Sequence, residues 1–117
     1  MLPLTNVAVG ARVEFQLDEQ AALHQRQELG VFVRFCIDQI ERDAGPAAWW
    51  KVTLAPQGLC YSCEVIVEHR GVVIHAGGNG FDAAVAGRDA FCKLDRVLHE
   101  TRVDLARLGS EVINVTR

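Results

Sequence analysis

The middle of the chain holds three strand-like segments in succession, each followed by a turn signal. The segments are residues 49–54 (WWKVTL), 59–69 (LCYSCEVIVEH) and 72–76 (VVIHA). The turn signals are Pro56-Gln57-Gly58, Arg70-Gly71 and Gly77-Gly78-Asn79-Gly80. Short apolar segments between such breaks predict strands. Adjacent strands form a sheet, and the apolar face of that sheet has to be covered by another layer.

Helical patterns on both sides of these strands supply the covering layer. From Leu29 to Ile40, apolar residues recur at the i, i+3, i+4 and i+7 spacing of a helix with one buried stripe. Gly45-Pro46 ends this helix, because proline cannot continue the hydrogen-bond ladder. A second helix is predicted from about Asp82 to Leu108, with the Asp82 carboxylate as its N-cap.

One more strand is predicted at residues 13–17 (VEFQL), where apolar and polar residues alternate. The predicted order is β-α-β-β-β-α, an α+β fold. We expect a two-layer sandwich, similar to a double-stranded RNA-binding domain, with two helices packed on one face of a four-stranded sheet. The whole chain, residues 1–117, is expected to form one domain with a short C-terminal tail at 109–117. The tail segment SEVINVTR fits either a fifth strand or a frayed end.

The bulk composition places the chain among ordinary globular proteins. Its 117 residues are enough for one core, half of them are hydrophobic, and the net charge is −3. That charge neither supports nor excludes a nucleic-acid partner. Four irregularly spaced cysteines are unlike a secreted disulfide framework, and no signal peptide or apolar run of ~20 residues is expected. We therefore expect a reduced, cytoplasmic protein without a membrane partner.

A C-x-x-C pair, Cys60 and Cys63, is the motif that most suggests chemistry. Residues three apart on a strand point to opposite faces of the sheet, so the two thiols are expected to diverge. A redox pair needs a helix N-terminus, and no helix is predicted to start here. A zinc site would need further ligands, for which Cys36, Cys92 and His75 are the candidates. A coincidence of two cysteines on one strand is favoured over a thiol or zinc site, and no cofactor is expected.

No other motif predicts an enzyme or a small-molecule substrate. The pattern Gly78-x-Gly80-x-x-Ala83 matches a dinucleotide fingerprint, but it lacks the parallel βαβ context and is interpreted as a flexible turn. The four histidines are scattered without a Ser-His-Asp order. Trp49 and Trp50 fall on opposite faces of their strand, so one of them can be exposed. An exposed tryptophan could stack a base or meet a partner chain, but partial burial by neighbouring side chains is the more common arrangement.

The last helix carries a series of basic residues: Arg88, Lys93, Arg96, Arg102 and Arg107. Two of them form i, i+4 pairs with acidic residues, in Asp89–Lys93 and Arg96–Glu100. Spacing alone therefore favours a solvated charge ladder over a phosphate-binding face.

The run GVVIHAGGNGFDAAVAGRDAFCKLDRVLHETR, residues 71–102, resembles the short hibernation promoting factor and ribosome-associated inhibitor (RaiA) family. Members carry a strand ending like Ile74-His75-Ala76, then a glycine-containing turn, a capping aspartate and an alanine-rich helix with K-L-x-R-x-L. The matching residues here are Asp82, Ala83-Ala84 and Lys93-Leu94-Asp95-Arg96-Val97-Leu98. In the first helix, Phe32-Val33, Ile37 and Ile40-Glu41 fit family positions, while Cys36 and Gln39 stand where the family usually has lysine.

The resemblance implies ribosome hibernation and translation regulation in stationary phase or the stress response. Such proteins bind the small ribosomal subunit in the channel used by mRNA and tRNA, and basic side chains on their helices contact rRNA phosphates. The rRNA-binding residues implied here are Lys93, Arg96 and Arg102, with Arg88 and Arg34 as further candidates. The alternative is a diverged domain of the same fold that acts by protein–protein contact or as a homodimer.

Overall fold

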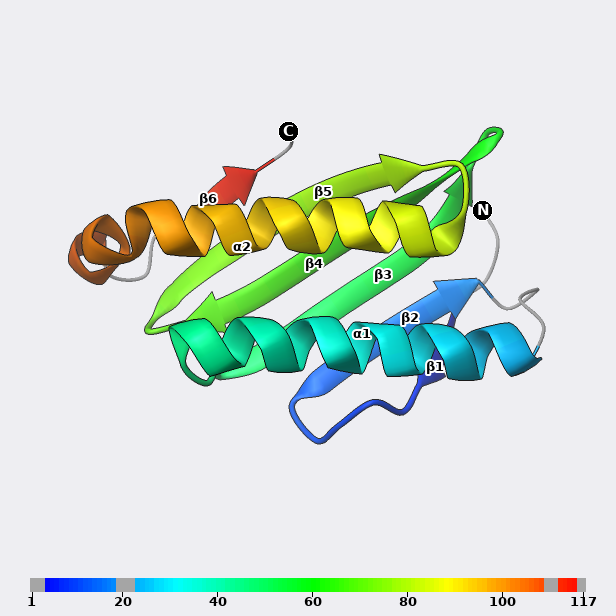
Figure 1. Cartoon of the computed structure of the whole chain (residues 1–117), viewed down its shortest axis with the longest axis horizontal. Helices are drawn as coiled ribbons and strands as arrows, with labels where there is room; N and C mark the ends of the chain where they lie inside the picture. Colours follow the sequence, from blue (N-terminus) through cyan, green and yellow to red (C-terminus); the bar gives the residue numbers. More distant parts are fainter. Residues whose placement is uncertain (1–3, 19–22, 109–111, 116–117) are drawn as a thin grey trace.

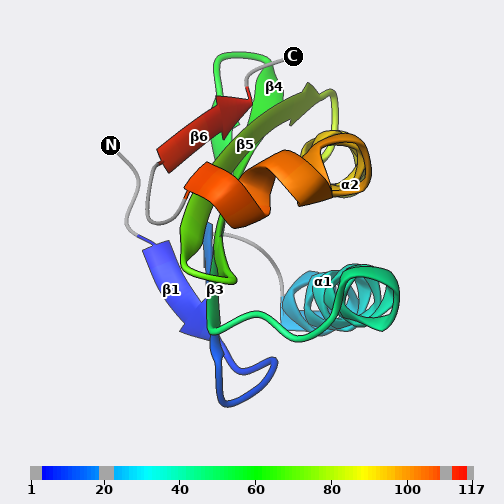
Figure 2. The ribbon, with the colours of Figure 1, turned by 90° about the vertical axis from the view of Figure 1, so that its left-hand side faces the viewer.

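The computed structural model describes residues 4–18, 23–108 and 112–115. The strands are β1 (Leu4–Val7), β2 (Val13–Asp18), β3 (Trp49–Gln57), β4 (Cys60–His69), β5 (Val72–Gly80) and β6 (Val112–Val115). The helices are α1 (Leu23–Ala44) and α2 (Ala83–Leu108). The strands form one mixed sheet in the order β1-β2-β3-β4-β5-β6, and both helices cover the same face of it (Figures 1 and 2). The predicted α+β class with two helices on one sheet face is confirmed.

The predicted four-stranded sheet is wrong, because a further strand is added at each edge. From β2 to α2 the elements follow the predicted order, but β1 pairs antiparallel with β2 and β6 pairs parallel with β5. The polar Thr5 and Asn6 interrupt the apolar pattern of β1, and an edge strand tolerates such residues because one side of it faces water. For the tail, the strand alternative holds over Val112–Val115.

The core lies between the helices and the sheet, and the predicted apolar faces supply it. Phe15 and Leu17 are buried on β2, while Val33, Ile37 and Ile40 are buried on α1. Further core residues come from the three central strands and α2: Trp50, Val52, Leu54, Cys63, Val65, Val67, Val72, Ile74, Ala76, Ala86, Ala90, Phe91, Leu94 and Leu98. The rings of Trp50 and Phe91 join the two layers, with their centroids 6.2 Å apart.

The helix ends are set by the residues that the sequence indicated. The Val85 amide donates to Asp82 Oδ1 at 2.8 Å, so Asp82 is the N-cap of α2. Gly45 has a φ of 92° and donates to the Glu41 carbonyl just past the end of α1. Helix α1 begins at Leu23, earlier than its apolar stripe indicated, because its first turns are polar.

The glycine run after residue 76 is part of β5, so its interpretation as a flexible turn is wrong. Gly78 pairs with Cys63, and Gly80 pairs with Tyr61. A Cβ built on Gly78 would lie 2.3 Å from the Ala90 nitrogen and 2.7 Å from the Ala86 carbonyl oxygen of α2. Glycine is needed here because the helix backbone packs directly on the strand.

Candidate nucleic-acid interface

Arg88 and Arg96 are the exposed arginines among the residues of α2 whose side chains the structure describes. Both are exposed, and no hydrogen bond or ion pair joins either guanidinium to another residue of the described chain. The two residues are eight positions apart, which corresponds to about 12 Å along the helix axis. That spacing allows each guanidinium to contact a separate phosphate of one RNA strand.

Lys93 lies between these two arginines in sequence but is held against the sheet. Its Nζ is 3.0 Å from Asp89 Oδ2 and donates to the Gly77 carbonyl at 3.3 Å, and its side chain is only 13% exposed. The predicted Asp89–Lys93 pair is therefore confirmed. The hydrogen bond from the Asn79 amide lowers the pKa of Asp89, and the contact with Lys93 lowers it further. The Asp89 carboxylate therefore links α2 to β5. Lys93 therefore stabilises the packing of α2 on β5, and the Asp89 carboxylate already neutralises its charge.

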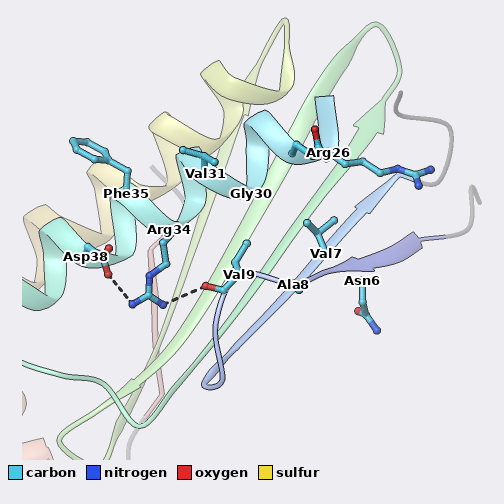
Figure 3. Close-up of a pocket in the computed structure, with 11 residues that line it drawn as sticks. Asn6, Val7, Ala8, Val9, Arg26, Gly30, Val31, Arg34, Phe35 and Asp38 are labelled. Carbon is cyan, nitrogen blue, oxygen red and sulfur yellow. Dashed lines mark hydrogen bonds and ion pairs between the residues drawn. The ribbon is translucent and has the colours of Figure 1, made fainter. Parts of the chain in front are cut away.

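Arg34 is directed to the β1 side of α1, away from the α2 arginines. Its Nη1 donates to the Val9 carbonyl at 3.2 Å, and its Nη2 is 2.9 Å from Asp38 Oδ1 (Figure 3). The structure thus does not bring Arg34 together with the basic residues of α2. The Arg102 backbone belongs to α2, but its side chain lies outside the described residues, as do the side chains of Glu100 and Arg107.

A groove of about 210 Å³ between the helices contains the two positions that are usually lysine in the resembling family. Cys36 and Gln39 line it from α1, opposite Arg88 and Cys92 of α2. Burial is the main cause that raises the pKa of Cys36 to about 11, and the neighbouring Cys92 raises it as well. The nearby Arg88 has the opposite effect and lowers this pKa. Asp43 and Asp95 also line this groove. The groove between the helices is therefore mixed in charge, with Arg88 as the basic residue among those that line it.

The cysteines and histidines considered for a thiol or metal site do not form one among the described residues. Cys60 is exposed and Cys63 is buried, on opposite faces of β4 as predicted, and burial raises the pKa of Cys63 to about 12. Among the described residues, no group of three His, Cys, Asp or Glu side chains is arranged to hold a metal ion. His69 Nε2 donates to the Ala44 carbonyl at 2.9 Å, and His75 Nε2 is 2.8 Å from Glu64 Oε2.

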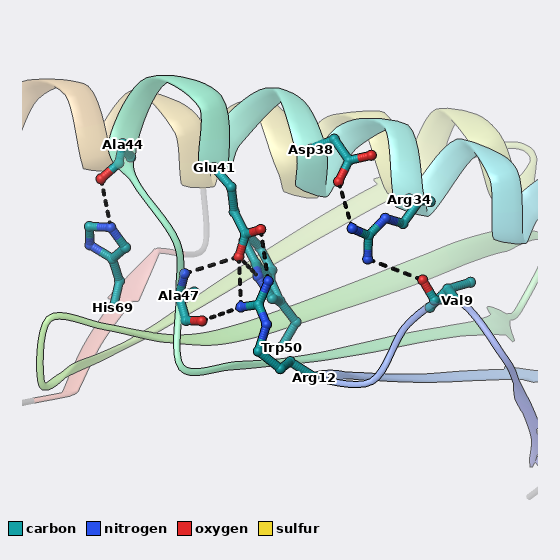
Figure 4. Close-up of polar contacts among 9 residues, drawn as sticks. All are labelled: Val9, Arg12, Arg34, Asp38, Glu41, Ala44, Ala47, Trp50 and His69. Atoms are coloured by element: carbon teal, nitrogen blue, oxygen red, sulfur yellow. Dashed lines mark hydrogen bonds and ion pairs between the residues drawn. The ribbon is translucent and has the colours of Figure 1, made fainter.

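A polar network centred on Glu41 was not anticipated from the sequence. Its Oε2 accepts hydrogen bonds of 3.0 Å each from Arg12 Nη1, the Ala47 amide and Trp50 Nε1, and its Oε1 accepts from Arg12 Nη2 at 3.1 Å (Figure 4). Arg12 also donates to the Ala47 carbonyl. Trp50 is thus buried, and its indole N–H has a hydrogen-bond acceptor in Glu41. Trp49, on the opposite face of β3, is 37% exposed, and its indole N–H donates to the Glu68 carboxylate.

The chain matches no protein-family model, and no curated protein matches it either. The family resemblance therefore rests on the quoted residues of the first helix and of the C-terminal half, and on the order of elements from β2 to α2. Over the part of the chain that the structure describes, neither helix is long and apolar enough to cross a membrane.

Proposed function

We propose that the protein binds rRNA of the small ribosomal subunit through the outer face of α2 and silences translation as a hibernation factor. Occupation of the mRNA and tRNA channel by the rigid two-layer domain prevents the entry of either RNA. No covalent step is involved, so the protein acts as a cytoplasmic binding protein without a cofactor or small-molecule substrate.

The observation that carries the proposal is the exposure of Arg88 and Arg96 on the helix that bears the family resemblance. Arginine binds phosphate well because its planar guanidinium donates two parallel hydrogen bonds. Neither guanidinium has an acidic partner among the described side chains, so a phosphate contact there replaces no described contact. Arg96 occupies a position that is basic in the resembling family, and Arg88 lies about two turns before it.

The proposal changes the role of two residues that the resemblance implied, Lys93 and Arg34. Lys93 and Arg34 stabilise the fold, because each already has a carboxylate and a backbone carbonyl as partners. Arg102 remains a candidate for a further phosphate contact. The rRNA-binding residues proposed first are thus Arg88 and Arg96.

Inhibition of cell-free translation by the purified protein tests this proposal. The variant is Arg88→Glu/Arg96→Glu, and its control is Lys51→Glu/Arg70→Glu, which changes the net charge equally at exposed positions of β3 and the β4–β5 turn. We expect the wild type and the control to inhibit translation. The α2 variant should need about thirtyfold more protein, because it loses two charge-assisted phosphate contacts and gains repulsion. Equal inhibition by both variants, or no inhibition by the wild type, would contradict the proposal.

A further inference from the structure

A groove with a mainly apolar lining lies between α1 and the β1 edge. Its volume is about 860 Å³ (Figure 3). Val7 and Val9 form its floor with Gly30, where a Cβ would lie only 3.3 Å from the Val9 side chain. On its α1 rim stand Val31, 72% exposed, and Phe35, 60% exposed. Two large apolar side chains one helical turn apart, beside an open apolar groove, form a surface suited to a protein partner.

The groove is bordered by an unpaired sheet edge. Strand β1 is the first in the sheet order, and its only partner among the described strands is β2. Its outer backbone N–H and C=O groups can therefore pair with a strand from another chain. Leu4 of this strand is also 39% exposed.

The charges on this side of α1 make the surface complementary to itself. Arg26 lines one end of the groove and Asp38 the other, with the apolar residues between them. The two charged residues are twelve positions apart, about 18 Å along the helix. When two copies of α1 run antiparallel, Arg26 of each copy lies opposite Asp38 of the other. The Asp38 side chain is 47% exposed beside Arg34, so it stays accessible to a second cation.

We propose that the α1–β1 edge is a homodimer interface with two-fold symmetry. Strand β1 pairs antiparallel with its copy and joins the two sheets, while Phe35 of each protomer enters the groove of the other. Such an interface is isologous, because the same patch serves on both protomers. Arg88 and Arg96 lie on α2 and make none of the contacts proposed here, so the dimer does not depend on the proposed rRNA contact.

Sedimentation velocity of the purified protein over a dilution series tests the dimer without ribosomes. We expect a dimer with a dissociation constant below about 100 μM. Phe35→Glu should raise that constant about tenfold or more, because it places a charge at the centre of the interface. Phe81→Glu is the matched control: Phe81 is 77% exposed just before α2 and does not line this groove, so the constant should not change. Val31→Glu should act like Phe35→Glu and provides a second variant if the first does not fold.

Mixing two charge variants tests the antiparallel arrangement itself. Arg26→Glu alone and Asp38→Arg alone each bring like charges together across the two-fold axis, so each should be monomeric while keeping the wild-type circular dichroism spectrum. An equimolar mixture should form a heterodimer, because Glu at position 26 then meets Arg at position 38. A wild-type protein that stays monomeric at about 100 μM, or a dimer that Phe35→Glu and Val31→Glu leave intact, would overturn the proposal.

Discussion

Glu41 connects three segments that are far apart in the sequence. Its carboxylate is bonded to Arg12 in the β1–β2 turn, to the Ala47 amide after α1, and to Trp50 on β3. Burial alone would raise its pKa, but the hydrogen bonds from Arg12, Ala47 and Trp50 outweigh burial and lower the pKa to about 2. The charged form is therefore the one that the folded state requires.

Glu41→Gln should destabilise the fold by about 2 kcal/mol, because it keeps the side-chain shape but removes the charge that Arg12 and Trp50 bind. Urea unfolding at neutral pH measures the difference. The control is Asp43→Asn, an exposed carboxylate half a turn further along α1, which should change stability by less than about 0.5 kcal/mol. Equal urea midpoints for the two variants would show that the network contributes nothing.

The lowered pKa of Glu41 also determines how the stability of the fold should depend on pH. Because the folded-state pKa of Glu41 is about 2 against an ordinary 4.5, its stabilisation is complete above about pH 5 and is lost as the pH falls toward 2. The loss should be about 2 kcal/mol, allowing for solvent screening at Arg12, whose side chain is 43% exposed. The stability difference between the wild type and Glu41→Gln should therefore shrink across this range. A difference that stays constant down to pH 2 would contradict the assignment.

Single residues also show what the sequence could and could not reveal. The Asp89–Lys93 pair was predictable, because residues four apart on a helix are neighbours whatever the tertiary fold. The bond of Arg34 to the Val9 carbonyl, and that of Lys93 to the Gly77 carbonyl, join elements 25 and 16 residues apart. Such contacts depend on the packed arrangement, so the basic residues could be found in the sequence while their availability for RNA could not.

Among the elements, strong periodicity was the dependable signal. The stripe from Leu29 to Ile40 and the alternation in residues 13–17 gave one helix and one strand correctly. Strand β1 escaped prediction because it has only four residues and two of them are polar. The extension of β5 through Gly80 also escaped prediction, because glycine usually marks a turn and only the close approach of α2 explains it here.

Gly78→Ala should separate α2 from β5 and destabilise the fold by about 3 kcal/mol, because the added methyl group overlaps the helix backbone. Gly77→Ala is a matched control on the neighbouring residue: a Cβ there has no atom within 4 Å. It should stay within about 0.5 kcal/mol of the wild type. Thermal unfolding compares the two variants, and similar midpoints would contradict the packing argument.

As a whole, the molecule separates two candidate surfaces in its helix layer. The α2 side offers Arg88 and Arg96 for phosphate contacts, and the α1 side offers the groove beside β1 with Val31 and Phe35. Figure 1 shows that α1 lies on the β1 side of the sheet and α2 on the β6 side. The proposed RNA contact and the proposed self-association therefore involve different residues, and separate substitutions can test them.

The central claim is that the α2 face binds the small ribosomal subunit. Its most direct test is co-sedimentation of the purified protein with isolated small subunits, at low and at raised salt, beside Arg88→Glu/Arg96→Glu. We predict binding that salt weakens, and for the variant a salt dependence whose slope is smaller by about 2, one for each lost phosphate contact. Absence of binding at low salt, or binding that neither salt nor the variant changes, would contradict the claim.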